Sequence, residues 1–302
     1  MKSPHRHQGH IARKRFGQNF LIAQDVIKNI VDAIAPRDDD VIVEIGPGLG
    51  ALTDPLLQRI GHLQVVEIDR DLIARLRSRY PVERLTIHEG DALEFDFGAL
   101  KTAGPMKIIG NLPYNISSPL LFHLVAFSPL VAEMYFMLQK EVVDRMVAGP
   151  GSSEFGRLSV MLQYRYQMEC LFVVPPESFN PAPKVESAIV RMIPRRFDLS
   201  VGADETKANT KTTTLQGGRA KDALCAVACD DTPLPTAIDE SRFANLVMAA
   251  FSQRRKMLRN TLKSHIAEAD LAALGINPMA RAEDIAVADY VRLSNFLTAS
   301  NA

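Results

Sequence analysis

The chain has 302 residues, of which 47% are hydrophobic and 23% charged, an ordinary globular composition with room for one large domain or two. Lys plus Arg equals Asp plus Glu at 35 each, so the net charge predicts no particular partner. The polar, basic start lacks an apolar core segment, which argues against a signal peptide. The apolar stretch 116–138 is interrupted by polar residues and prolines, which argues against a membrane span.

The cysteines are few. Cys170, Cys225 and Cys229 do not make a disulfide framework, and Cys225 and Cys229 lack the second ligand pair that a zinc site needs. We therefore expect no metal and a reducing, cytoplasmic location. Nothing in the sequence assigns an oligomer, so a monomer is the default expectation.

From about residue 40, short apolar runs alternate with helical stretches. Predicted strands cover 41–45, 63–68, 85–88, 107–109, 134–138, 171–174 and 188–193. One predicted helix follows the first strand and its turn and runs to about residue 60, and the others cover 71–79, 118–127, 141–147 and 158–168. Apolar runs without alternation are typical of parallel strands buried on both faces. The order of elements predicts a doubly wound α/β sheet, and the last two strands predict an antiparallel pair at one edge.

The second part of the chain differs in composition. Residues 198–240 are polar, rich in Thr and Gly and without periodicity, which predicts a flexible insertion or linker. Apolar residues then recur at helical spacing from Phe243 to Leu262, which predicts a smaller all-α C-terminal domain. We divide the chain into a basic N-terminal segment or lid (1–20), an α/β domain (21–197), the insertion (198–240) and the helical domain (241–302).

Two segments, 1–20 and 242–263, carry basic residues and no acid. On a neutral chain such segments favour an anionic partner, with nucleic acid as the first candidate, although a solvated tail and a solvated helix face are the plain alternatives. The second segment contains Arg254, Arg255, Lys256 and Arg259. Helical spacing predicts Arg255 and Arg259 on one side of a helix.

The first predicted strand contains Glu44 and leads into a turn with three glycines, Gly46, Gly48 and Gly50. Glycines let the backbone turn tightly and approach a ligand closely. The spacing G-x-G-x-G differs from the dinucleotide fingerprint G-x-G-x-x-G, and no Lys follows as a P-loop requires. Alone, the turn fits either a ligand site or a simple tight turn.

Polar residues also follow the next three predicted strands. Glu67 ends the second strand about 20 residues beyond the glycines, the distance at which an acid reaches ribose hydroxyls. Asp91 and Ala92 follow the third strand, and Asn111 ends the fourth. Because parallel strands end at the same edge of a sheet, these residues converge on one crevice.

This combination resembles the S-adenosylmethionine-dependent methyltransferases of Rossmann-like fold. The resemblance implies S-adenosyl-L-methionine as cofactor and S-adenosyl-L-homocysteine as product. It implies a glycine turn that faces the methionine moiety, with Glu67 on the ribose hydroxyls and Asp91 on the adenine amino group.

With a methyl donor in the crevice, the sequence Asn-Leu-Pro-Tyr at 111–114 predicts a site for the exocyclic amine of adenine. That amine is a poor nucleophile because its lone pair is delocalised into the ring. We expect the Asn111 oxygen and the Leu112 carbonyl to accept its two hydrogen bonds, with Pro113 fixing the turn. Tyr114 then offers a face for the flipped base to stack on. Phe179 is a candidate for the other face of the base, and a buried loop anchor is its alternative reading.

Six segments together resemble the ribosomal RNA adenine N6-dimethyltransferases, in their bacterial small-subunit branch: KRFGQNFL (14–21), EIGPGLGALT (44–53), NLPYNISSP (111–119), GRLSVMLQY (156–164), FNPAPKVESAIVR (179–191) and AFSQRRKMLRNTL (250–262). The resemblance implies dimethylation of two adjacent adenines near the 3′ end of 16S rRNA, within an immature small subunit. It implies that Gln18, Asn19 and Leu21 help to close the cofactor pocket, and that the basic run faces RNA phosphates. The family usually has a shorter connection where this chain has 198–240.

Two other functions stay open from the sequence. One is an assembly or quality-control factor that acts by binding the ribosome, for which a catalytically dead variant would still support maturation. The other is a DNA adenine or small-molecule methyltransferase, against which the basic C-terminal segment and the lack of a DNA-recognition motif argue.

Overall fold

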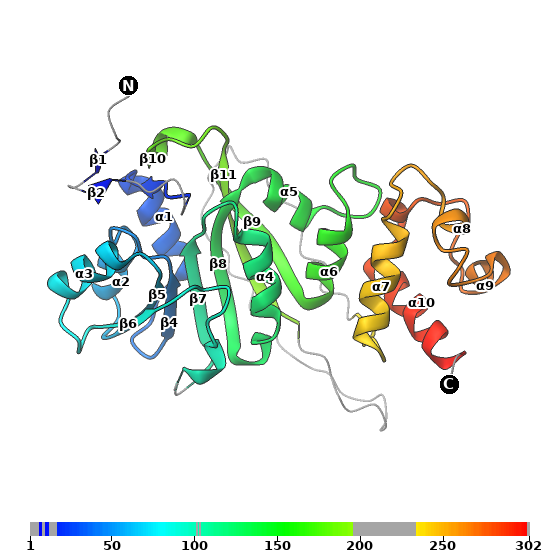
Figure 1. Cartoon of the computed structure of the whole chain (residues 1–302), viewed down its shortest axis with the longest axis horizontal. Helices are drawn as coiled ribbons and strands as arrows, with labels where there is room; N and C mark the ends of the chain where they lie inside the picture. Colours follow the sequence, from blue (N-terminus) through cyan, green and yellow to red (C-terminus); the bar gives the residue numbers. More distant parts are fainter. Residues whose placement is uncertain are drawn as a thin grey trace.

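The computed structural model describes residues 6–7, 10–11, 17–100, 102, 104–195 and 234–300. A seven-stranded sheet forms the larger part, and a group of helices lies beside it at the C-terminal end (Figure 1). The sheet contains β4 (Val41–Ile45), β5 (Leu63–Glu67), β6 (Leu85–Glu89), β7 (Met106–Asn111), β8 (Val131–Gln139), β9 (Tyr166–Val174) and β11 (Ser187–Pro194). The helices of this part are α1 (Gln24–Ile34), α2 (Thr53–Leu57), α3 (Arg70–Arg79), α4 (Ser117–Val125), α5 (Lys140–Val147) and α6 (Arg157–Arg165).

The strand order is β6-β5-β4-β7-β8-β11-β9. Neighbours from β6 to β8 are parallel, whereas β11 is antiparallel to both β8 and β9. The predicted doubly wound α/β sheet and its antiparallel pair at one edge are therefore confirmed. The chain leaves β4 in one direction along the sheet, towards β5, and later returns to its other side as β7, so the strand order reverses at β4.

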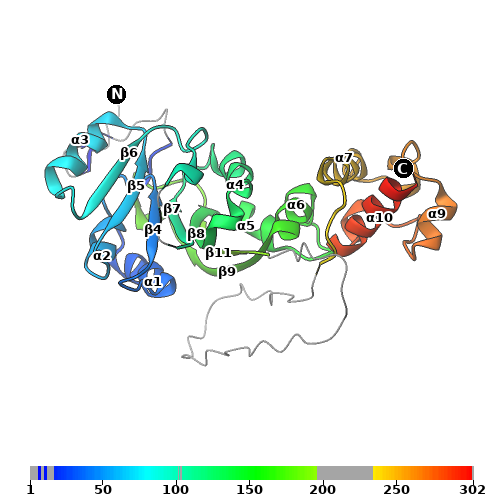
Figure 2. The same cartoon turned by 90° about the horizontal axis from the view of Figure 1, so that it is seen from below.

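Helices cover both faces of the sheet, and alternate strand residues supply the two cores. In β8, Met134 and Phe136 belong to the cluster with α4, α5 and α6, whereas Tyr135 and Met137 belong to the cluster with α1, α2 and α3. Figure 2 shows α1 and α2 on one side of the strands and α4 on the other. Burial on both faces explains why the strand sequences lack alternation.

A short two-stranded ladder joins the start of the chain to the loop before β11. β3 (Phe20–Leu21) pairs antiparallel with β10 (Phe179–Asn180), which places Phe179 opposite Leu21. The amide of Ile22 adds a 2.8 Å bond to the carbonyl of Ser178. A second small ladder joins β1 (Arg6–His7) to β2 (His10–Ile11).

The C-terminal helices are α7 (Glu240–Ala250), α8 (Leu258–Thr261), α9 (Glu268–Ala273) and α10 (Val287–Ala299). They share a core with α6, where the Tyr164 and Phe243 rings lie 4.7 Å apart and the Tyr164 hydroxyl accepts a 3.0 Å bond from the Ala237 amide. Figure 2 shows α6 between the sheet and this group.

Two helix predictions are wrong in extent. The apolar spacing from Phe243 to Leu262 is divided between two helices, since α7 stops at Ala250 and turns and bends lead to α8 at Leu258. The amide of Leu258 donates to the carbonyl of Ala280 at 2.9 Å, a tertiary contact that starts α8. Arg255 therefore lies in a turn and does not share a helix face with Arg259. The predicted helix over 158–168 ends at Arg165, because Tyr166 pairs with Pro194 in the sheet.

The expectations for most of 1–16 and for 198–233 lie outside the described residues. Within the described part, no helix is long and apolar enough to cross a membrane, and no group of three or more metal-binding side chains occurs. Cys170, buried on β9, is disulfide-bonded, which the sequence analysis did not anticipate.

Gly110 in β7 lies close to the backbone of β4. A Cβ atom at this position would lie 2.7 Å from the carbonyl oxygen of Ile45 and 2.9 Å from Cδ2 of Leu112. Because a backbone carbonyl in a sheet cannot swing aside, we expect Gly110→Ala to lower the free energy of unfolding by about 1–3 kcal/mol, measured by urea denaturation. The control is Gly61→Ala, where a Cβ atom meets nothing within 4 Å. Equal stability of the two variants would contradict the close approach.

Candidate active site

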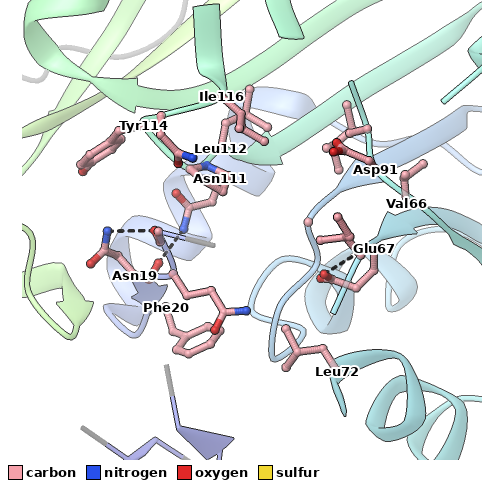
Figure 3. Close-up of a pocket in the computed structure, with 18 of the residues that line it drawn as sticks. Asn19, Phe20, Val66, Glu67, Leu72, Asp91, Asn111, Leu112, Tyr114 and Ile116 are labelled. Carbon is pink, nitrogen blue, oxygen red and sulfur yellow. Dashed lines mark hydrogen bonds between the residues drawn. The ribbon is translucent and has the colours of Figure 1, made fainter. Parts of the chain in front are cut away.

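A cavity of about 310 Å³ opens at the carboxyl edge of β4, β5, β6 and β7 (Figure 3). This edge, at the point where the strand order reverses, is where open α/β sheets bind ligands. The segment 17–20 and the turn after β7 complete its wall. Predicted site residues that line it are Gln18, Asn19, Gly46, Glu67, Asp91, Ala92, Asn111, Leu112, Pro113 and Tyr114.

Three predicted cofactor residues lie outside this lining. Leu21 and Glu44 line an adjoining cavity of about 630 Å³, which also reaches Asn111. Gly48 acts through its backbone amide, which donates to Oε2 of Glu67 at 3.4 Å. These residues border the site rather than face its centre.

The glycine turn after β4 exposes backbone atoms to the cavity at Gly46. Gly46 has a φ of +67°, and a Cβ atom there would meet no protein atom within 4 Å. Its amide donates to the carbonyl of Val66 at 2.9 Å, which fixes the start of the turn against β5. The open space beside Gly46 is a cradle that a side chain would fill and that a ligand can occupy.

Glu67 ends β5 with its carboxylate held in place. Oε1 accepts from the amides of Ile68 and Asp69, both at 2.9 Å. Burial raises the pKa of Glu67, and the backbone hydrogen bonds oppose that rise. A carboxylate oxygen has more than one acceptor site, so Glu67 keeps capacity for hydroxyl donors of a ligand.

Asp91 and a set of apolar side chains form the next part of the wall. Asp91 Oδ1 accepts from the Leu93 amide at 2.9 Å, and Oδ2 has no partner among the described residues. Apolar lining comes from Val66, Ile68, Ala92 and Ile116. Ile68 lines the cavity and is 44% exposed, so its side chain is accessible to the flat ring of a ligand. An acid beside an apolar slot fits an aminopurine.

Asn111 is oriented by the N-terminal segment. Its Nδ2 donates to the carbonyl of Asn19 at 3.0 Å (Figure 3). The amide nitrogen is thus engaged, and the side-chain oxygen has no donor among the described residues. The amide of Leu112 donates to Met137 at 3.2 Å, and no described residue donates to the Leu112 carbonyl. Two acceptors are therefore available next to each other at the end of β7.

Tyr114 is half-buried at the cavity wall and is held at both ends. Its carbonyl accepts from Oγ of Ser117 at 3.0 Å, and its hydroxyl lies 2.7 Å from Oγ of Ser187. The amide of Ile116 closes the turn on the carbonyl of Pro113 at 3.1 Å. Burial raises the pKa of the Tyr114 phenol, which stays protonated at neutral pH.

The segment 17–20 lies over the cavity and is tied to it. Nε2 of Gln18 donates to Oδ2 of Asp69 at 3.1 Å, which links this segment to the loop after β5. Phe20 also lines the cavity, a role that the sequence analysis missed although the residue stands in the segment KRFGQNFL. The contribution of Ser187 was missed as well, since it comes from a strand distant in sequence.

Phe179 is not brought to the cavity. It is 4% exposed and belongs to the core cluster with α1, opposite Leu21 in the β3–β10 ladder. The expectation that its ring faces the target base is thus not met in this structure. Its position matches the alternative of a buried loop anchor.

The basic run near α8 divides into two kinds of residue. Arg254 bonds the carbonyl of Ser153 and lies 3.3 Å from Oε2 of Glu283, and Arg259 lies 3.7 Å from Glu268. Arg255 and Lys256 are exposed and form no ion pair with any described residue. Within this run, Arg255 and Lys256 are thus the two side chains without an ion-pair partner among the described residues, and they are open to an outside anion.

The comparisons with known proteins agree with this geometry. The family model described as "Ribosomal RNA adenine dimethylase" matches residues 9–213. A protein of Aromatoleum aromaticum named "Ribosomal RNA small subunit methyltransferase A" is 54% identical over 292 residues, 97% of this chain and 96% of its own. One of Dechloromonas aromatica with the same name is 50% identical over 291 residues, 96% of this chain and 100% of its own.

Solved structures share the fold. A dimethyladenosine transferase from Plasmodium falciparum has a TM-score of 0.70 at 23% identity, covering 93% of this chain and 98% of its own. The 23S rRNA methyltransferase ErmE has a TM-score of 0.64 at 23% identity, covering 93% of this chain and 100% of its own.

The fold and the solved structures show a Rossmann-like sheet with a helical C-terminal part, and the family model and the curated relatives make the chain an S-adenosylmethionine-dependent methyltransferase. Within that class, the chain belongs to the ribosomal RNA adenine dimethylase family. The predicted family, cofactor and type of enzyme are thereby confirmed.

Glu44 gives the site a pH-dependent stability. It is 2% exposed, its Oε2 accepts from Oγ1 of Thr53 at 2.7 Å, and burial raises the pKa of its carboxyl from 4.5 to about 7. The folded state therefore binds this proton more tightly than the unfolded state. Its contribution to stability is complete below about pH 4.5 and is lost as the pH rises through about 7.

We expect Glu44→Gln, which keeps an acceptor for Thr53, to remove this loss. The unfolding free energy of the native protein should fall relative to the variant by about 2 kcal/mol between pH 5 and 8, measured by urea denaturation. The variant Glu83→Gln, at an exposed position, is the control. Parallel pH profiles for the native protein and Glu44→Gln would refute the buried-proton assignment.

Proposed function

We propose that this protein transfers methyl groups from S-adenosylmethionine to N6 of two adjacent adenines near the 3′ end of 16S rRNA, in an immature small ribosomal subunit. The observation that carries the proposal is the fixed Asn111 side chain, whose nitrogen is bound to Asn19 and whose oxygen is left as an acceptor beside Tyr114. The relatives named as small-subunit methyltransferases support the choice of the small subunit.

The cofactor fits the cavity residue by residue. Glu67 would accept from the ribose hydroxyls, and Asp91 would accept from the adenine amino group beside Ile68 and Ala92, which line the same cavity. The open space beside the Gly46 backbone would take the methionine moiety, with Gly48 and Glu44 behind it. Gln18, Asn19 and Leu21 close the pocket from the N-terminal segment.

The reaction needs an activated amine more than a base. When bound, the cofactor would supply a methyl group from a positively charged sulfonium, which leaves as the neutral thioether of S-adenosyl-L-homocysteine, while the methylated nitrogen gives up one proton to water. The Asn111 oxygen and the Leu112 carbonyl accept the two N–H groups of the target amine and favour a pyramidal nitrogen with an available lone pair. Because both acceptors are fixed before the substrate arrives, they need no reorganisation during transfer.

Tyr114 and Pro113 define the place of the base. The half-buried Tyr114 ring offers a stacking face, worth about 1–3 kcal/mol for an unpaired base. Pro113 fixes the turn between the acceptors and this ring. An adenine must leave its own stack to enter, which suits an incompletely assembled ribosomal site.

The C-terminal helices and the exposed turn before α8 supply the RNA contact. Arg255 and Lys256 meet phosphates there, contacts that position the enzyme but do not specify a sequence. We assign the α/β part to catalysis, the helical part to RNA binding and the segment 1–20 to a lid. The protein acts as a monomer in the cytoplasm, where its substrate is assembled.

The central test is transfer of labelled methyl to small subunits that lack dimethyladenosine, with nuclease mapping of the product. We expect Asn111→Ala to lower the rate by about 100-fold, because one pre-set acceptor in an active site is commonly worth that much. The control Asn29→Ala removes an exposed asparagine on α1. Undiminished transfer by Asn111→Ala would refute the acceptor role, and no transfer by the native protein would refute the function.

A second test separates the two kinds of basic residue. We expect Arg255→Ala and Lys256→Ala each to weaken binding to small subunits and to reduce the slope of log affinity against log salt by about 1. The melting temperature should not change, since neither side chain has an ion-pair partner among the described residues.

Arg254→Ala should behave differently. It breaks contacts to Ser153 and Glu283, so its melting temperature should fall along with any change in binding. The exposed Arg37, in the loop between α1 and β4, is the control, and Arg37→Ala should leave both measurements unchanged. A fall in melting temperature for Arg255→Ala equal to that for Arg254→Ala would contradict this division.

A further inference from the structure

The antiparallel strand β11 reaches the catalytic turn through one side chain. Oγ of Ser187 lies 2.7 Å from the hydroxyl of Tyr114. Ser187 is the first residue of β11 and is fully buried. It stands in register with Gln139 of β8 and Val174 of β9, so its backbone is fixed by a strand on each side.

The hydrogen bond between Ser187 and Tyr114 restricts the one motion that Tyr114 retains, the rotation of its ring about the side-chain torsions. The turn from Pro113 to Ile116 and the bond from Ser117 fix the backbone of Tyr114. The ring can still swing about its side-chain torsions, and a hydrogen bond at the far tip of the ring stops that swing. No other described residue has a hydrogen bond to the Tyr114 hydroxyl.

The ring plane matters because the ring lines the cavity beside Asn111 and Leu112. A base stacked on Tyr114 takes its height and tilt from that plane. The exocyclic amine projects from the edge of the base, so a small tilt of the ring displaces the amine from both acceptors. Misplacement of a reacting group by about 1 Å can lower a rate by about 100-fold.

We propose that Ser187 is a positioning residue that sets the plane of Tyr114 and, through it, the position of the target amine. The proposal rests on the proposed function, since it concerns the same base. Ser187 itself touches neither cofactor nor substrate in this scheme. Its role differs from that of Phe179 in the same loop-and-strand segment, which is a core residue.

The test is a double-mutant cycle with Ser187→Ala and Tyr114→Phe. Each variant removes the hydrogen bond from one side and leaves the aromatic ring in place. We expect kcat/KM for small subunits to fall about three- to tenfold in each, the usual worth of one neutral hydrogen bond. The double variant should fall no further than the single ones, because the two changes remove one interaction. The dissociation constant for S-adenosylmethionine should change less than about twofold, which separates positioning of the base from damage to the pocket.

Ser294→Ala is the matched control. Ser294 is also a fully buried serine, and its hydroxyl has no hydrogen-bond partner among the described residues. It lies on α10, away from the cavity. We expect this variant to keep the native kcat/KM.

The outcomes are distinct. Unchanged kcat/KM in Ser187→Ala or in Tyr114→Phe, or losses that multiply in the double variant, would overturn the proposal while native activity upholds the function. If Ser187→Ala does not fold, Tyr114→Phe decides alone, because its change is at a half-buried ring tip. A native protein that transfers no methyl to small subunits would overturn the proposed function and this inference together.

Discussion

The parallel pairing of β4 with β7 is the constraint on which the site depends. Glu44 stands opposite Ile109 in this pair, and the two strands approach so closely at Gly110 that no side chain fits there. The approach places the end of β7 beside the glycine turn that leaves β4. Since β5 pairs with the other side of β4, Glu67 arrives at the same edge. With β6 parallel to β5, the polar groups of the cavity are thus neighbours because four parallel strands end together, although the chain separates them widely.

The same edge of the sheet is covered by an N-terminal segment that is not part of the seven-stranded sheet. Residues 17–22 are held by the β3–β10 ladder, by the bond between Asn19 and Asn111 and by the bond between Gln18 and Asp69. The bond to Asn111 joins this segment to the cavity wall, and the other two contacts join it to the loop after β5 and to the segment before β11. The segment is therefore in contact with the end of β7, with the loop after β5 and with the segment before β11 at the same time. A cofactor that enters beneath it contacts a wall whose parts are already connected.

Much of this arrangement follows from the sequence, and the exceptions have physical causes. Strand positions were predictable because buried parallel strands are continuous apolar runs, as in Val41–Ile45. The end of α7 was not, because residues 251–257 contain no Gly or Pro and the apolar spacing continues to Leu258. Tertiary contacts end the helix there: Phe251 packs near Tyr290, at 5.9 Å between ring centroids, and β-bridge pairing of Met257 with Arg281 redirects the chain. The strand-end acids and the turn at 111–114 could be placed in one crevice from topology alone. The burial of Phe179 and the contact of Ser187 with Tyr114 could not be predicted, since both depend on how the segment around β10 and β11 packs against the rest of the sheet.

The turn from Asn111 to Tyr114 shows how several single hydrogen bonds together fix the orientation of a short segment. The Asn111 side chain is held by the N-terminal segment, the Leu112 amide by β8, the Tyr114 carbonyl by the start of α4 and the Tyr114 hydroxyl by β11. Each of these is one hydrogen bond, with a net worth of about 1 kcal/mol. Because they come from four separate elements, none can shift without a change in the fold around it. The orientation of the Asn111 side chain, the Leu112 carbonyl and the Tyr114 ring is thus set when the protein folds. The antiparallel strand, which carries no cofactor residue, takes part in this through its first side chain.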